Sequence, residues 1–302
     1  MHVFVTGGAG NIGQEVVGFL HGQGHKVLVY DKAPYVGAVP VPSQIGDITE
    51  RDHLAALMGG DKFDAVIHLT SMLQFGCEVE PAKAIEVNVS GTVNVLEAAR
   101  RAGIGRVVLA GTLATYGSTD ARLDEDSPIQ ADAPLYGITK LIGEKVARRY
   151  NALYGMNCVC LRFGTVLSER PVSSPGVAAA VATLLGAAKG KDVVVKGVAA
   201  HERRHYVYFK DAALAAAIAA AAPKTEHDLF NIAGDDDCYV SFQDIADLVR
   251  KHAPKAGRIA FEGRSGDRGS MDTSRARREL DFRPTYVLDR AVAEIIERNP
   301  AQ

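Results

Sequence analysis

The stretch Thr6-Gly7-Gly8-Ala9-Gly10-Asn11-Ile12-Gly13 decides the fold, because it connects an apolar run at residues 2–6 to a helical pattern at residues 11–22. Its first glycine permits a tight turn, its second lets the backbone approach a pyrophosphate, and its third lets the helix pack on the strand. The start of the helix offers oriented N–H groups to an anion. We therefore predict a dinucleotide-binding turn, with a merely tight strand-to-helix turn as the alternative. The predicted contacts are Gly7, Gly10, Asn11, Ile12 and Gly13.

Apolar runs alternate with helical patterns through the first half of the chain. The predicted strands span residues 2–6, 26–31, 65–70, 106–112 and 157–163. The predicted helices span residues 11–22, 81–102 and 133–154. Strands that are apolar throughout, rather than at alternate residues, are typical of a parallel sheet buried on both faces. The pattern predicts an α/β fold of the Rossmann type, a doubly wound parallel sheet with right-handed crossovers.

The pattern changes after about residue 163. Alanine-rich and amphipathic helices alternate there with short extended segments and with loops that contain glycine and aspartate. The predicted helices span residues 177–188, 212–222 and 242–252, and the extended segments span residues 193–196 and 205–209. We predict a dinucleotide-binding Rossmann domain over residues 1–165 and a smaller α/β substrate-binding lobe over residues 166–302. This lobe is expected to interleave with the sheet and to cover the carboxyl ends of its strands.

The composition is that of an ordinary globular protein. Of the 302 residues, 47% are apolar and 23% are charged, which excludes a disordered or fibrous chain. The 34 basic and 36 acidic residues give a net charge of −2. Proteins that bind nucleic acid or an anionic membrane surface carry a positive excess, so neither partner is expected. A small-molecule partner is predicted instead.

The cysteines and histidines form no metal-binding or disulfide pattern. The four cysteines include no C-x-x-C pair, and the nine histidines include no H-E-x-x-H sequence, so we predict no metal. His68, in a predicted buried strand, is interpreted as a core residue. The first residues enter a strand without the charged region and cleavage site of a signal peptide, which predicts a cytoplasmic protein.

Acidic residues follow the second and third strand regions. Asp31 lies 18 residues after Gly13, where a carboxylate accepts hydrogen bonds from an adenosine ribose diol and repels a 2′-phosphate. It favours NAD over NADP, with a simple turn residue as the alternative. Asp47 and Ile48 are expected to frame the adenine, although Asp47 also suits an ordinary turn.

A tyrosine and a lysine lie one helical turn apart in Tyr136-Gly-Ile-Thr-Lys140. A phenol has a pKa near 10 and is a poor base at neutral pH unless a nearby cation stabilises the phenolate. Thr112 ends the preceding strand and adds a hydroxyl. Such a pair is common on helix surfaces, but together with the glycine turn and Asp31 it predicts that Thr112, Tyr136 and Lys140 are catalytic.

In these motifs the chain resembles the extended branch of the short-chain dehydrogenase/reductase superfamily, which contains sugar-nucleotide epimerases and dehydratases. The resemblance covers nearly the whole chain. Its motifs are Gly7-x-x-Gly10-x-x-Gly13, Asp31, Gly46-Asp47-Ile48, His68-Leu69-Thr70, Asn88 to Ala99, Thr112 to Gly117 and Tyr136-x-x-x-Lys140. The resemblance implies that NAD is the cofactor and that further residues lie beside it. These residues are Leu69, Thr70, Asn88, Tyr136, Lys140 and Phe163.

Two later segments bear on the substrate. Residues 203–211 and 264–267 resemble segments in which the sugar-nucleotide members carry two arginines that grip a diphosphate. A planar, permanently charged guanidinium suits that task. The resemblance therefore implies that Arg204 and Arg264 bind the substrate.

The chain also departs from the family's pattern. Thr165 stands where the family usually has asparagine, and Gly164 stands where it usually has an aromatic residue. Leu113 and Ala114 replace the Asp-Glu pair that dehydratases use to eliminate water. A dehydratase is therefore disfavoured.

We predict an NAD-dependent 4-epimerase of a UDP-sugar or another sugar nucleotide, with Tyr136 as acid and base and with Thr112, Tyr136 and Thr165 at the substrate. The alternative is net oxidation or reduction of a small alcohol such as a hydroxy-amino acid or sugar acid, because residues 161–164 and 72–80 also resemble the short-chain threonine dehydrogenases. A third interpretation is a non-catalytic protein that senses NAD(H). The resemblance implies a homodimer formed through the helices at 81–102 and 133–154.

Overall fold

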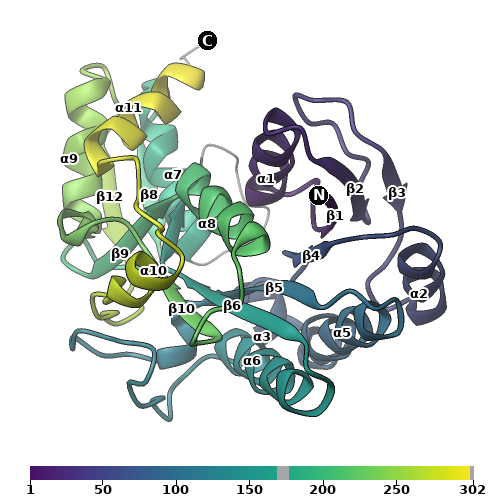
Figure 1. The fold of residues 1–302 in the computed structure, drawn as a ribbon. Helices are drawn as coiled ribbons and strands as arrows, with labels where there is room; N and C mark the ends of the chain where they lie inside the picture. The colour runs from purple at the N-terminus through teal and green to yellow at the C-terminus, as the bar shows by residue number, and fades with distance from the viewer. Residues whose placement is uncertain (169–176, 300–302) are drawn as a thin grey trace.

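A seven-stranded sheet organises the molecule (Figure 1). The computed structural model describes residues 1–168 and 177–299. The strand order is β10-β6-β5-β4-β1-β2-β3, and each neighbouring pair is parallel. The strands are β1 His2–Thr6, β2 Lys26–Asp31, β3 Ser43–Ile45, β4 Ala65–His68, β5 Arg106–Thr112, β6 Asn157–Phe163 and β10 Leu229–Ile232. The predicted Rossmann α/β fold is confirmed.

Helices cover both faces of this sheet (Figure 1). One face carries α1 Asn11–Gly22 and α8 Phe209–Ala221, and the other carries α2 Arg51–Gly59, α5 Gly91–Arg101 and α6 Leu135–Tyr154. Successive residues of a strand point to opposite faces, so Val3 and Val5 join the first core whereas Phe4 joins the second. The strands are apolar throughout because both faces are buried.

The second half of the chain contributes directly to this sheet. β10 extends the sheet beside β6, and α8 packs on α1 and on the strands. The alanines of α8 permit this close packing. Arg106 at the start of β5 donates through Nε to the carbonyl oxygen of Ala219, at 2.7 Å, near the end of α8. The chain thus passes from the sheet into the later lobe and back.

The predicted helix at 81–102 is helical throughout but not uniform. It consists of α4 Pro81–Ala84, a π-helical segment Ile85–Ser90, and α5. The prediction of one regular helix is therefore corrected, because periodicity does not reveal an added residue per turn. π-helical turns are frequent at functional sites. Here the segment contains Asn88, whose side chain is buried.

The later lobe has its own core beside the sheet (Figure 1). Its strands are β7 Thr165–Leu167, β8 Val193–Lys196, β9 Arg203–Tyr208, β11 Tyr239–Ser241 and β12 Ile259–Glu262. Its helices are α7 Val177–Gly186, α9 Phe242–His252, α10 Ser274–Glu279 and α11 Leu288–Arg298. The strands form two small sheets, ordered β11-β9-β7 and β12-β8. Among the residues that the structure describes, no helix is long and apolar enough to cross a bilayer.

Several elements differ from the predicted ranges. β4 ends at His68, two residues before its predicted end, and α8 begins at Phe209, three residues before its predicted start. The short strands β7, β10, β11 and β12 were not predicted, because three or four residues are too few for a clear alternation. α11 was also not predicted, although Leu288, Val292 and Ile295 bury one face at helical spacing.

Candidate functional site

The glycine turn between β1 and α1 has no room for side chains. Gly7 has φ +73°, and a Cβ built there would lie 2.7 Å from the amide nitrogen of Thr70. A Cβ on Gly13 would lie 2.1 Å from the carbonyl oxygen of Gly7. Gly10 is the N-cap of α1 and offers no side-chain oxygen, so no side chain caps Asn11 and the rest of the first turn. The turn therefore suits a pyrophosphate that accepts from backbone N–H groups.

The side chain of Asp31 is hydrogen-bonded to this turn. Its Oδ2 accepts from the N–H of Ala9 at 3.0 Å, and its Oδ1 accepts from the N–H of Ala33. Lys32, the adjacent cation, pairs instead with Asp47 at 3.0 Å. Burial acts to raise the pKa of Asp47, but hydrogen bonds from Thr49 and Lys32 outweigh it and lower the pKa to about 2. The carboxylate of Asp31 therefore stays beside the turn, as NAD binding requires.

The residue after Asp47 has a structural role. Ile48 is buried in the core beneath β1 and β2, where it packs against Gly91 at the start of α5. The predicted contact of Asp47 and Ile48 with an adenine remains a prediction.

Tyr136 and Thr112 meet at the carboxyl end of β5. Thr112 ends the strand and accepts from the N–H of Ala114 at 3.2 Å, which caps the 3-10 helix Leu113–Tyr116. The side chains of Thr112 and Ser71 approach the hydroxyl of Tyr136, in the first turn of α6, closely enough to act on its pKa. Burial raises the pKa of Tyr136 to about 12, although both neighbouring side chains act to lower it. Ser71, just beyond β4, was not predicted.

Lys140 lies one turn after Tyr136, and its side chain is buried. It is 7% exposed and makes no hydrogen bond or ion pair with any residue that the structure describes. Burial lowers its pKa to about 8, although Cys160, Glu144 and Cys77 act to raise it. An unpartnered ammonium at this place fits a cofactor hydroxyl that would accept its hydrogen bond.

A small cavity lies against Lys140. Its volume is about 10 Å³, enough for one water molecule. Polar side chains from four elements line it, among them His68, Asn88, Thr92 and Glu144. Lys140 therefore faces polar side chains across this cavity, rather than an apolar core.

His68 and Asn88 are both occupied by protein contacts. The ring nitrogens of His68 lie 2.7 Å from the Thr6 hydroxyl and 3.1 Å from the Thr92 hydroxyl, and burial lowers its pKa to about 3. This confirms a core histidine. Asn88 accepts from the N–H of Met72 at 2.7 Å and donates to the Met72 carbonyl and to Thr139. Asn88 thus fixes the loop after β4, which carries Ser71.

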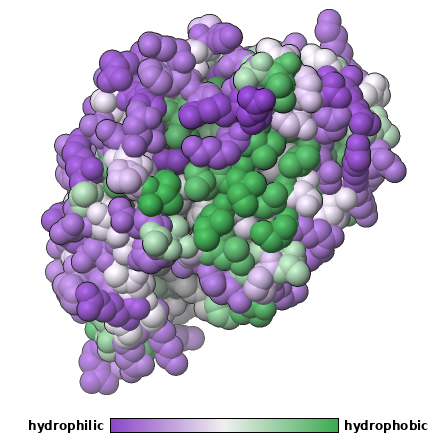
Figure 2. Space-filling model, turned by 90° about the horizontal axis from the view of Figure 1, so that it is seen from below, coloured by the Kyte–Doolittle hydropathy of each residue, from purple (hydrophilic) through white to green (hydrophobic). Residues whose placement is uncertain are grey.

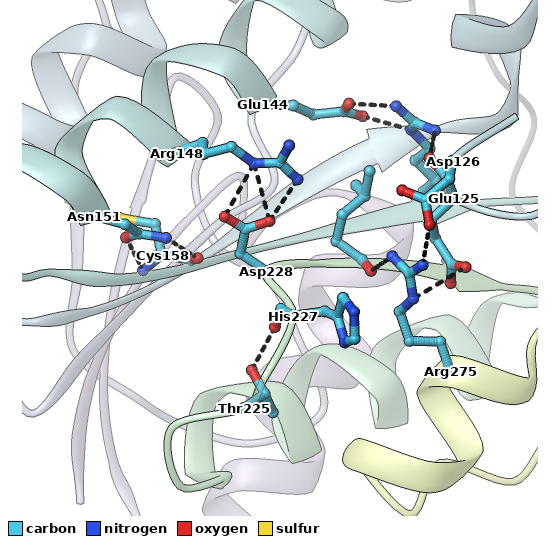
Figure 3. A network of polar contacts seen from close by, with 12 residues as sticks. Glu125, Asp126, Glu144, Arg148, Asn151, Cys158, Thr225, His227, Asp228 and Arg275 are labelled. Carbon is cyan, nitrogen blue, oxygen red and sulfur yellow. Dashed lines mark hydrogen bonds and ion pairs between the residues drawn. The ribbon is translucent and has the colours of Figure 1, made fainter. Parts of the chain in front are cut away.

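A buried ion pair joins α6 to β6 (Figure 3). Glu144, one turn after Lys140, binds Arg162 of β6 through two hydrogen bonds of 2.9 and 2.7 Å. Both side chains are buried, and the guanidinium of Arg162 lies over the ring of Tyr116. Neither residue was predicted, although an arginine within the apolar run at 157–163 was an available signal, since a buried charge needs a partner.

The network continues to the later lobe (Figure 3). Arg162 donates to the carbonyl oxygen of Glu125, whose carboxylate accepts from the N–H of Asn231 in β10 at 2.7 Å and lies 3.5 Å from Arg275 of α10. Tyr116 donates to the side chain of Asn231. Helix α6 is therefore joined to β10 and α10 by buried polar contacts.

The predicted cofactor residues at the strand ends lie close to the turn. The N–H of Leu69 donates to the carbonyl oxygen of Thr6 at 3.0 Å, and the Leu69 side chain packs on the first core. Thr70 lies against Gly7. Phe163 is buried at the end of β6. Gly164 has no space for an aromatic side chain, because a Cβ there would lie 2.6 Å from the His205 carbonyl oxygen.

The three other predicted substrate residues, Thr165, Arg204 and Arg264, differ in their surroundings. Thr165 is buried in β7, opposite Tyr206 of β9. Arg204 is fully buried, donates to Ser265 at 2.5 Å and lies 3.5 Å from Glu202. Arg264 is exposed.

The position of the unpredicted Arg268 differs from that of Arg264. Arg268 is partly buried and donates to Ser118, in the loop that follows the 3-10 helix.

Comparisons with known proteins agree with this geometry. Residues 3–233 match the model of the NAD dependent epimerase/dehydratase family. The UDP-glucose 4-epimerase of Azospirillum brasilense is 35% identical over 193 residues, which are 61% of this chain and 54% of that protein. The match thus spans about half the length of this curated relative.

Two solved structures share the fold over almost the whole chain. The UDP-glucose 4-epimerase of Thermotoga maritima with UDP-glucose has a TM-score of 0.87 at 23% identity, covering 98% of each chain. An L-threonine dehydrogenase from Cupriavidus necator in its holo form has a TM-score of 0.89 at 24% identity, covering 99% of this chain and 100% of that chain. The fold alone does not distinguish these activities. The family match agrees with the glycine turn, Asp31 and the Thr112, Tyr136 and Lys140 set: the chain belongs to the NAD-dependent epimerase/dehydratase family, whose members are enzymes.

Proposed function

We propose that the chain is an NAD-dependent 4-epimerase of a sugar nucleotide, with a UDP-sugar as its first candidate substrate. The observation that carries this proposal is the hydroxyl of Tyr136, shared with Thr112 and Ser71, one turn from the buried and unpartnered Lys140. The relative named as a UDP-glucose 4-epimerase supports the choice of reaction. The replacement of the dehydratase acid pair by Leu113 and Ala114 supports it further.

Each residue of the site has its own role in the proposed reaction. NAD, when bound, supplies a reversible hydride acceptor for the carbon that is oxidised. Tyr136 takes the proton of the sugar hydroxyl and returns it after the keto sugar has turned over. Thr112 donates a hydrogen bond to the reacting oxygen. Lys140 binds a ribose hydroxyl and stabilises the phenolate, and with a pKa of about 8 it is mostly protonated at neutral pH.

The reaction can be tested with purified protein. The protein should interconvert UDP-glucose with UDP-galactose, or the N-acetyl form of one with that of the other. The absorbance of NADH at 340 nm should show no net change. Tyr136→Phe serves as the control, because it removes only the hydroxyl. If none of these sugar nucleotides is interconverted, the epimerase proposal fails.

The second candidate is net oxidation or reduction of a small hydroxy-amino acid or sugar acid. Gly164 and Thr165, where the family usually has larger side chains, favour it, as does the likeness of fold to an L-threonine dehydrogenase. Steady formation of NADH from L-threonine would support this activity.

We also propose a cytoplasmic homodimer. All four cysteines are free and buried, as expected in a reducing compartment. Figure 2 shows an apolar patch on the lower side of the molecule, where α6 and the helical segments before α5 lie in Figure 1. Exposed apolar residues of this region are Leu73, Phe75, Val79, Ile85 and Ile138. Light scattering should report a dimer, and Ile138→Glu should shift it towards a monomer.

A further inference from the structure

A buried carboxylate lies near the ammonium of Lys140. Glu144 follows Lys140 by one turn of α6, and both side chains line the small cavity beside the lysine. Side chains four residues apart on a helix lie on the same face. Within residues 1–168 and 177–299, no acid forms an ion pair or a hydrogen bond with Lys140. The two charges therefore face each other across the cavity without direct contact.

The backbone of β5 lies close to this carboxylate. Gly111 of β5 lines the cavity, and a Cβ built on it would lie 3.2 Å from Oε1 of Glu144. Gly143 lines the cavity from α6 and likewise adds no side chain. Lys140 is 7% exposed and Glu144 is 8% exposed. Bulk water therefore screens the interaction between the two charges only weakly.

Arg162 of β6 holds the carboxylate in place. Its Nε donates to Oε1 of Glu144 at 2.9 Å, and its Nη2 donates to Oε2 at 2.7 Å (Figure 3). The guanidinium is fixed in turn, because it lies over the ring of Tyr116 and donates to the carbonyl oxygen of Glu125. A bidentate pair of this kind favours the ionised carboxylate. Glu144 therefore stays charged and cannot turn towards Lys140.

The other titratable groups around Lys140 are neutral near pH 7. They are Cys77 of α3 (Gln74–Val79), His68 of β4, Cys160 of β6 and Tyr136 of α6. Burial raises the pKa of both thiols and of the phenol, and it lowers the pKa of the imidazole. The side chains that β5, the π-helical segment and α5 contribute to the cavity are uncharged, among them Asn88 and Thr92.

This arrangement shows which group keeps the buried ammonium charged. Burial lowers the pKa of Lys140 to about 8, while Cys160, Glu144 and Cys77 act in the opposite direction. A thiol opposes the loss of the proton only when it is ionised, and both thiols are protonated near pH 7. The carboxylate of Glu144 is therefore the negative charge that acts on Lys140 at neutral pH. Without this carboxylate, a buried ammonium loses its proton more readily.

We propose that Glu144, held by Arg162, is a positioning residue that keeps Lys140 charged from across the cavity. It acts through the lysine rather than on the reacting atoms. This role of Glu144 rests on the proposed function only in that the charge of Lys140 supports the phenolate of Tyr136. The effect of Glu144 on the lysine itself is the same whichever alcohol is oxidised.

The charge of Lys140 can be followed directly by NMR of the NAD-loaded protein with ¹³C at the ε-carbon of its lysines. The signal that is missing from Lys140→Arg belongs to Lys140. In Glu144→Gln its titration midpoint should fall by about one pH unit, because the opposite charge is lost. In Arg162→Met the midpoint should rise, because the carboxylate is no longer neutralised. Lys145→Gln changes an exposed charge beside Glu144 and should shift the midpoint by less than about 0.2 pH units.

Opposite shifts distinguish an electrostatic role from a structural one, because both variants break the same ion pair. Glu144→Asp keeps the charge and should shift the midpoint less than Glu144→Gln. If Glu144→Gln does not fold, the double variant Glu144→Gln with Arg162→Met replaces it, since no buried charge is then left unpaired. Its midpoint should also fall, but by less. An unchanged midpoint in Glu144→Gln, or shifts of the same sign in both single variants, overturns the proposal.

The pH profile of turnover separates this proposal from the proposed function. The alkaline limb of kcat/KM should move together with the NMR midpoint in each variant. A limb that stays fixed while the midpoint moves overturns the link from Glu144 to turnover. If no sugar nucleotide is epimerised, the proposed function fails, and the NMR midpoints still decide whether Glu144 keeps Lys140 charged.

Discussion

The buried cations Lys140 and Arg268 lie in different surroundings. Lys140 is buried alone, and the groups that face it from α3 (Gln74–Val79), β4, α6 and β6 are neutral or acidic: Cys77, His68, Glu144 and Cys160. Arg268 is partly buried beside a like charge, Arg204. Lys140 has no hydrogen-bond acceptor among the described residues, whereas Arg268 donates to Ser118. The comparison indicates that backbone shape and short spacings define the surroundings of Lys140, while contacts between distant segments define those of Arg268.

Removing the phenol should produce the largest loss on the cofactor side. Tyr136→Phe leaves the ring in place between Ser71 and Thr112 but removes the acid and base. We expect kcat to fall about a thousandfold, within the usual range for general acid–base catalysis. NAD content, measured after denaturation, should stay unchanged. Turnover within about tenfold of wild type would show that Tyr136 is not the acid and base.

Breaking the buried pair behind α6 should affect stability. Glu144→Gln leaves Arg162 buried without its partner, so we expect the free energy of unfolding to fall by about 3–5 kcal/mol. Arg148→Gln is the control on the same helix, because the Arg148–Asp228 pair is solvent-exposed, and its loss should cost less than about 1 kcal/mol. Denaturant titration measures both. Equal losses would contradict a special role for the buried pair.

The pH dependence should report Lys140. Its pKa is about 8, below the usual value, so the side chain loses its charge as the pH rises through 8. The neutral amine no longer stabilises the phenolate, and kcat/KM should fall about tenfold per pH unit above that value. Lys140→Arg stays charged, so its profile should lack this alkaline limb. A wild-type profile that stays flat up to pH 10 would disagree with the buried lysine described here.

The smallest effect is expected on cofactor choice. Asp31→Asn removes the charge beside the glycine turn, so the preference for NAD over NADP should fall about tenfold. Asp31→Glu keeps the charge and should retain the preference. Dissociation constants for both dinucleotides measure the ratio, and an unchanged ratio in Asp31→Asn would show that another group selects the cofactor.

Local spacing made the cofactor side predictable. The glycines of the turn at Gly7 are close together in the sequence, and so are Tyr136 and Lys140. One turn or one helix therefore fixes the geometry of each motif. Asn88 could be expected near the site, but not its contacts with Met72, because the π-helical segment that carries it has no signature in the hydrophobic pattern.

Contacts between distant residues could not be predicted in the same way. Arg268 meets Ser118 across 150 residues, and Glu144 meets Arg162 through the pairing of β5 with β6. No periodicity links such partners, so the sequence alone could not bring them together. An arginine in a polar loop looks the same in the sequence whether it is solvated or bonded to a distant segment.

The fate of the hydrogen at the reacting carbon tests the central claim most directly. UDP-galactose deuterated at C4 is incubated with the NAD-loaded protein in ordinary water, and the product is analysed by mass spectrometry and NMR. The account predicts UDP-glucose that retains deuterium at C4, since hydride leaves and returns to one carbon within a single site, and no product with Tyr136→Phe. Product that carries solvent hydrogen at C4, or unchanged epimerisation by Tyr136→Phe, would contradict it.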